Sequence, residues 1–168
     1  MEVSSYKSEL IEDDGDDMDA RHIALVQASF EQVAAFGERL SEIFYAELFV
    51  IDPSLRAMFD GNMRRQHMKF MMTLALIVRS LHEPEKSFHT IQNLAIKHVG
   101  YGVRAKHFTP FGNALLRTLK KLLGSDYTRD VADAWEESFR MLARFMKQAE
   151  SYAAVDVRKA DHSAPPPA

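Results

Sequence analysis

The chain has 168 residues, of which 46% are hydrophobic, enough to build the core of a single domain. The formal net charge is −3 with acidic and basic residues intermixed, which argues against a nucleic-acid partner. Cysteine is absent, which excludes disulfides, thiolate zinc sites and cysteine nucleophiles. Seven histidines and nine methionines remain as candidate nitrogen or sulfur ligands.

Neither a membrane span nor a targeting segment is expected. The longest apolar run, residues 74–78, is too short to cross a bilayer, and the acidic N-terminus lacks the pattern of a secretory signal. The cytoplasm is therefore the expected location. Clustered acidic residues predict a disordered arm over residues 1–18, and the proline-rich end predicts a flexible tail over residues 153–168. A single domain is expected between them, over residues 19–152.

The first half of this domain has the period of amphipathic helices. Apolar residues recur every three or four positions over residues 23–33, which predicts a helix that is broken at Gly37. Residues 40–51 continue the same pattern as a second helix. Asp52 then provides an N-cap and Pro53 a first helical residue, which together predict a short third helix.

The second half is helical by the same criterion. A long helix is predicted around residues 67–81, and a shorter one over residues 91–98 that stops near Gly100. Two further apolar stripes, over residues 111–122 and 131–149, predict the last two helices. No segment alternates with the period of two that strands require, so the expected fold class is all-α.

His98 is the first candidate functional residue. It lies on the apolar face of its predicted helix, one turn beyond Leu94. An unpaired buried imidazole is costly, so His98 needs a partner. That partner is either a backbone carbonyl, as for an ordinary core histidine, or a metal, and the position of His98 alone leaves both open.

Tyr45 and Gln66 are the second pair of candidates. Tyr45 lies in an apolar stretch and its hydroxyl needs a partner, while Gln66 shares a helix face with Phe70 four residues later. A tyrosine at the edge of the core with its hydroxyl in water is one reading. Two neutral donors facing an apolar cavity are the other, and they suit a bound ligand with partial negative charge. Phosphate-binding loops, serine-hydrolase elbows and zinc-protease motifs are absent.

Five segments then resemble one family. They are FYAELF at 44–49, DPSLRAMFD at 52–60, QHMKFM at 66–71, KHVGYGV at 97–103, and Ala134 with Trp135. In this order and spacing they resemble bacterial single-domain globins and the globin domain of flavohaemoglobins, over roughly residues 20–150. The resemblance implies a globin fold that encloses haem b. The apolar side chains of the pocket are expected to supply most of the free energy of haem binding.

The resemblance also implies roles for individual residues. His98 is the implied proximal iron ligand, and Tyr45, Gln66 and Phe70 are the implied distal residues. The residues implied to contact the cofactor lie on four helices and one turn, and are Phe59, Gln66, Lys69, Phe70, Lys97, His98, Tyr101, Val103, Phe108 and Phe111. The distal iron position is expected to be open, with coordination by His67 as the rival arrangement.

Two departures from the family bear on activity. In relatives, a tyrosine that is hydrogen-bonded to a glutamate supports the proximal histidine. Here Glu150 falls at the position of that glutamate, but Phe108 stands at the position of the tyrosine and has no hydroxyl. We therefore expect a backbone carbonyl near Leu94 to accept the second N–H of His98, and weak peroxidase activity at most. No flavin or nicotinamide domain is expected, so we expect a separate reductase to supply the electrons for any nitric oxide dioxygenase reaction.

The expected function is reversible binding of oxygen, and also of nitric oxide or carbon monoxide. It serves oxygen delivery or, with an external reductase, nitric oxide scavenging. A haem-based gas sensor acting on a separate partner protein is the alternative. A helical signalling module without haem is a third reading, against which His98, Tyr45 and Gln66 argue. The expected assembly is a monomer or homodimer, with no nucleic-acid or membrane partner.

Overall fold

A computed structural model describes residues 18–59, 61–82, 93–100 and 102–162, with side chains as far as residue 148. This part of the chain is helical and contains no strand, which confirms the all-α prediction. Its elements are α2 (Ala20–Ala34), α3 (Glu38–Ile51), η1 (Pro53–Phe59), α4 (Met63–Ser80), a helical segment at 93–100, η2 (Ala105–His107), α6 (Phe108–Leu123), η3 (Gly124–Asp126) and α7 (Arg129–His162).

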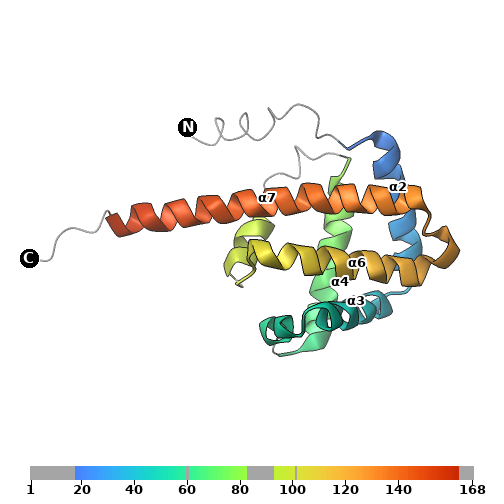
Figure 1. The fold of residues 1–168 in the computed structure, drawn as a ribbon, viewed down its shortest axis with the longest axis horizontal. Helices are drawn as coiled ribbons and strands as arrows, with labels where there is room; N and C mark the ends of the chain where they lie inside the picture. The colour runs from blue at the N-terminus through green and yellow to red at the C-terminus, as the bar shows by residue number, and fades with distance from the viewer. Residues whose placement is uncertain (1–17, 60, 83–92, 101, 163–168) are drawn as a thin grey trace, which may run out of the picture.

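The helices form two crossed layers around one core. In Figure 1, α6 and α7 run side by side along the long axis, α4 crosses behind them, and α3 lies beneath α6. The side chains of Leu40, Leu48 and Leu119 are fully buried where α3 packs on α6. Burying such a side chain contributes about 1.5–3 kcal/mol, so this contact is a major source of stability.

One polar contact fixes α2 against α7. Trp135 Nε1 donates a hydrogen bond of 2.9 Å to the hydroxyl of Ser29, and both residues are buried. An indole N–H that is removed from water needs such an acceptor. The helices α6 and α7 also approach closely at Gly112, where an added Cβ would lie 2.6 Å from the ring of Phe139.

A buried carboxylate links α3 to α6. Glu47 is only 9% exposed and pairs with Lys121 Nζ and, at 3.6 Å, with Arg117 Nη1. The hydrogen bond from Lys121 holds the pKa of the Glu47 carboxyl below its ordinary value, with further help from the charge of Arg117. The carboxylate therefore stays ionised, and its two cationic partners compensate for its removal from water.

Local signals in the sequence set several of the helix ends. The side chain of Asp52 accepts a hydrogen bond of 3.0 Å from the backbone N–H of Ser54, which confirms the predicted N-cap. Asn62 caps α4 in the same way by accepting from the N–H of Arg65 at 3.3 Å. Gly37 separates α2 from α3 with φ of 56°, a backbone conformation that side chains disfavour.

The structure adds detail near both ends of the predicted domain. Met18, which the prediction places in the acidic arm, is buried in the core and its Sδ accepts a hydrogen bond from Ser138. Residues 1–17 lie outside the described part of the chain. The predicted tail from residue 153 is helical as far as His162, because α7 continues through it. Among the described residues, no helix combines the length and apolar character needed to cross a membrane.

Candidate functional site

His98 lies on the helical segment 93–100 and is half-buried. Its Nδ1 donates a hydrogen bond of 2.8 Å to the carbonyl of Leu94, one turn back, as the sequence predicts. Since a carbonyl can only accept, Nδ1 carries a proton, and in the neutral imidazole Nε2 then keeps its lone pair. This orientation leaves Nε2 as the ring nitrogen suited to bind a metal, because a ligating histidine usually donates its other N–H to an acceptor of this kind.

The turn beyond His98 has a helix-ending geometry that depends on Gly102. The N–H of Val103 donates to the carbonyl of His98 at 3.0 Å, and the N–H of Gly102 donates to that of Val99 at 3.0 Å. These two bonds form a Schellman motif, which requires positive φ at the glycine, and Gly102 has φ of 84°. The motif brings Val103, which is buried, back against the turn that carries His98.

Aromatic rings from four elements meet in one cluster. Phe44 of α3 stacks on Phe70 of α4 with ring centroids 4.2 Å apart, and Tyr45 meets Phe59 of η1 edge-on at 5.1 Å. Phe111 of α6 lies 6.0 Å from Phe44 and 6.2 Å from Phe59. We call Phe44, Tyr45, Phe59, Phe70 and Phe111 the aromatic cluster. It gathers flat, apolar side chains of the kind that pack against a large aromatic cofactor.

Tyr45 is the polar member of the aromatic cluster. It is only 6% exposed, and burial raises the pKa of its hydroxyl to about 12. The phenol is therefore neutral at physiological pH and can donate a hydrogen bond.

His67 of α4 packs on Tyr45. From the sequence, His67 is predicted only as a rival iron ligand. The two rings stack with centroids 5.4 Å apart and an interplanar angle of 18°. The inner face of α4 follows His67, Phe70, Leu74 and Val78, at spacings of three and four residues. Gln66 lies at the edge of this face and is half-buried.

The other predicted cofactor contacts have varied surroundings. Val103 is buried and Phe108 half-buried, whereas Lys69 and Lys97 are exposed. Tyr101 lies outside the described residues. His107, which is buried close to this region, accepts a hydrogen bond of 3.0 Å from the N–H of Arg104 through Nδ1. The sequence did not predict the contributions of Phe44 and His67, although both fall on inward positions of their helices.

Comparison with known proteins gives consistent matches. Residues 42–146 match the sequence model of the globin family. A Flavohemoprotein of Bordetella pertussis is 29% identical over 140 residues, covering 80% of this chain and 35% of that protein. A Flavohemoprotein of Xylella fastidiosa is 30% identical over 132 residues, covering 77% of this chain and 33% of that protein. The chain thus spans about a third of the length of these curated relatives.

Solved structures agree on the fold. An engineered carbene transferase, built from a proposed nitric oxide dioxygenase of Rhodothermus marinus, matches with a TM-score of 0.75 and 25% identity. The match covers 84% of this chain and 99% of that one. A bacterial globin from Campylobacter jejuni matches with a TM-score of 0.70 and 24% identity, covering 81% of this chain and 99% of the other.

Proposed function

Since the chain belongs to the globin family, we propose that it holds haem b through His98 and reversibly binds oxygen, nitric oxide and carbon monoxide. The observation that carries this proposal is the hydrogen bond between His98 Nδ1 and the carbonyl of Leu94. It orients the imidazole and leaves Nε2 with a lone pair, as iron coordination requires. When bound, haem supplies the ferrous iron at which a diatomic gas coordinates.

The residues present fit such a cofactor. The aromatic cluster provides apolar ring faces from α3, η1, α4 and α6, and apolar burial supplies most of the free energy with which a single histidine can retain haem. Val103 adds a buried side chain next to the turn that carries His98. Gln66, Lys69, Lys97 and Phe108 belong to the same proposal as further contacts.

Tyr45 is proposed to discriminate between gases. Its neutral hydroxyl donates a hydrogen bond to a ligand that carries partial negative charge, and does so in a buried setting where that bond is strong. A hydrogen bond of this kind contributes about 1.5–3 kcal/mol. Oxygen, which becomes more polar than carbon monoxide when it binds, is favoured by such a donor. Gln66, at the edge of the inner face of α4, is proposed as a second hydrogen-bond donor to the same ligand.

Nitric oxide scavenging requires a source of electrons. The flavohemoproteins extend well beyond the matched part, since the alignments cover only 35% and 33% of their length. We propose that any nitric oxide dioxygenase activity uses a separate reductase as its electron donor. Peroxidase activity is expected to be weak, because the Leu94 carbonyl is a poorer acceptor than a carboxylate and makes His98 a less electron-rich ligand.

Haem retention tests the assignment of His98. His98→Ala is expected to purify with little haem and without a normal Soret band, because the one nitrogen ligand is lost. His22→Ala is the matched control, since His22 is also half-buried but pairs with Glu137 instead. Normal haem content and an unchanged spectrum in His98→Ala, with the control also normal, would remove His98 from the proposal.

Oxygen release tests the role of Tyr45. Tyr45→Phe keeps the ring contacts of the aromatic cluster and removes the hydroxyl. The loss of one charge-assisted bond is expected to speed oxygen release about 10- to 100-fold, while carbon monoxide release changes less. Stopped-flow displacement measures both rates. An unchanged oxygen off-rate would show that the hydroxyl does not reach the bound gas.

A further inference from the structure

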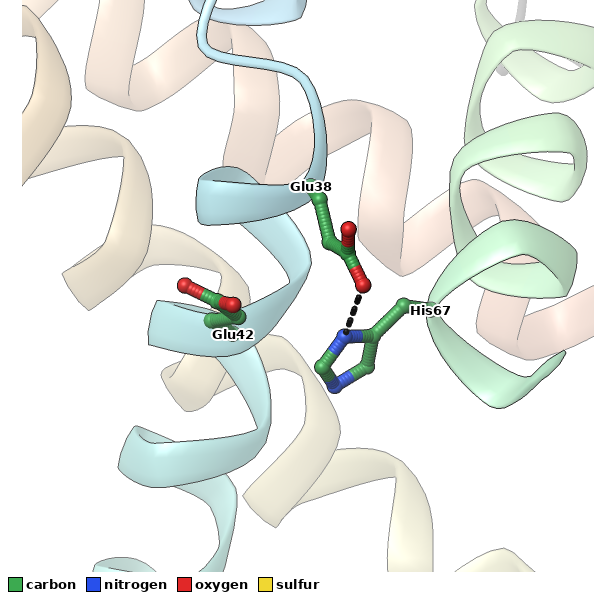
Figure 2. A group of neighbouring side chains, drawn as sticks. All are labelled: Glu38, Glu42 and His67. Atoms are coloured by element: carbon green, nitrogen blue, oxygen red, sulfur yellow. Dashed lines mark ion pairs between the residues drawn. The ribbon is translucent and has the colours of Figure 1, made fainter. Parts of the chain in front are cut away.

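A second group of ligand-type side chains lies beside Tyr45. Glu38 and Glu42 of α3 and His67 of α4 each offer one ligand atom, and these three atoms lie within 4.8 Å of one another. Figure 2 shows the imidazole of His67 reaching from α4 toward the start of α3, with its Nδ1 turned to Glu38. The group thus joins two helices that pack against each other, at a point that neither the family match nor the proposed haem contacts account for.

His67 has an unmet need for a partner. Its side chain is 13% exposed, and its Nδ1 is the buried side-chain polar atom that lacks a hydrogen bond in the described part of the chain. The nearest carboxylate oxygen, Glu38 Oε1, is 3.5 Å away, which is within ion-pair range but does not form a hydrogen bond. A buried nitrogen without a partner costs about 1–3 kcal/mol, so a ligand at this position would stabilise the fold.

The ring of His67 is already held in place for such a ligand. Stacking on Tyr45 at 5.4 Å sets the plane of the imidazole and keeps Nδ1 directed toward α3. Metal sites depend on this kind of support, because a ligand that is ordered beforehand loses little conformational entropy on binding. The stacked Tyr45 ring thereby acts as a positioning group for His67.

The two carboxylates add the charge that a cation needs. Glu38 and Glu42 are four residues apart on α3, so their side chains lie on the same face of the helix. Like charges at this spacing repel each other, and a bound cation would remove the repulsion. Both carboxylates are exposed, so an ion can reach them from solvent.

From this geometry we propose that Glu38, Glu42 and His67 form a binding site for a divalent transition-metal ion of the Zn²⁺ type. One imidazole nitrogen with two carboxylate oxygens is a donor set that zinc accepts, and it leaves a fourth position for water. Calcium and magnesium fit less well, because both prefer oxygen ligands alone. The bound ion cross-links α3 to α4, the helices that carry Tyr45 and Phe70.

A competition titration with zinc tests this site. The full-length, haem-loaded protein is treated with a chelator, dialysed, and titrated with Zn²⁺ against a fluorescent zinc indicator. One saturable site is expected, together with a rise in melting temperature on saturation. Absorption spectroscopy at the zinc edge, which does not overlap with iron, is expected to show one imidazole nitrogen at about 2.0–2.1 Å and oxygen ligands.

Three variants locate the site. His67→Phe keeps an aromatic ring beside Tyr45 but removes both nitrogens, and Glu42→Gln removes one charge with little change in shape. Each is expected to weaken zinc binding about tenfold or more, since even a lost supporting group costs a site that much. His22→Gln is the control, because His22 pairs with the single carboxylate of Glu137 and lacks a second one.

The outcomes separate cleanly. Weakened binding in both site variants with unchanged binding in His22→Gln supports the assignment. Equal zinc affinity in the wild type, His67→Phe and Glu42→Gln overturns it, as does the absence of a saturable site in the wild type. Circular dichroism without zinc checks that each variant folds. If His67→Phe is unfolded, Glu42→Gln and Glu38→Gln decide the question by the same criteria.

Discussion

Alkaline conditions are expected to destabilise this protein through Tyr45. The hydroxyl of Tyr45 has its pKa raised from 10.0 to about 12 by burial, whereas the unfolded chain exposes the same group to water at the ordinary value. Between these two values the unfolded state releases the proton and the folded state retains it. The contribution of the neutral phenol to stability is therefore complete below about pH 10 and is lost as the pH rises toward 12.

The size of this effect follows from the two pKa values. A shift of two pKa units corresponds to about 2.7 kcal/mol at full extent, since one unit is worth about 1.4 kcal/mol. At about pH 11, halfway through the window, about half of that amount is lost relative to pH 9. Tyr45→Phe has no group to ionise, and it retains the contacts of the ring with Phe44 and Phe59. The difference in stability between the two proteins isolates the phenol.

Denaturant unfolding monitored by circular dichroism gives this difference directly. The wild type and Tyr45→Phe are compared at about pH 9 and about pH 11, in the same cofactor state and buffer series, so that the titration of lysines and of the other tyrosines cancels. The wild type is expected to lose about 1.4 kcal/mol more than the variant between the two conditions. An equal loss in both proteins would show that the hydroxyl of Tyr45 is hydrated in solution, and would also weaken its assignment as a buried donor.

Two further predictions concern contacts between helices. Glu47→Gln is expected to cost about 1–2 kcal/mol near neutral pH, because it removes the charge that Lys121 pairs with. The lowered pKa of Glu47 means that its stabilisation is present above the unfolded value of 4.5 and lost as the pH falls through the folded value. Urea unfolding at neutral and acidic pH should show the cost shrinking on acidification, and a constant cost would contradict this. Gly112→Ala is expected to cost about 1–3 kcal/mol by thermal unfolding, since the new Cβ would lie 2.6 Å from the Phe139 ring. A negligible cost would mean that this ring moves aside freely.

Features that depend on residues close in sequence could be predicted. The helical period indicated the helices, and Asp52 indicated the start of η1 through its side-chain bond to the N–H of Ser54. The bond between His98 and the carbonyl of Leu94 was predictable for the same reason, because a spacing of four residues in a helix brings those groups together. Such contacts follow from helix geometry alone.

Features that depend on how helices are rotated against each other could not be predicted. His67 is one step of about 100° from Gln66, and only the packing of α4 on α3 decides that His67 stacks on Tyr45. The proximity of His67 to Glu38, 29 positions earlier, requires the same tertiary information. Composition alone also does not reveal that Met18 is buried and that its Sδ accepts a hydrogen bond from Ser138 of α7, because that contact joins residues 120 positions apart.

The length of α7 affects how the molecule moves through solution. With 34 residues this helix is about 51 Å long, and Figure 1 shows its C-terminal part extending well past the other helices. A body with such a projecting rod has more friction with water than a sphere of the same 19.2 kDa mass. It also rotates faster about the long axis of the rod than about the axes perpendicular to it. Sedimentation velocity should therefore give a raised frictional ratio, and amide N–H vectors along α7 should share one slow rotational correlation time.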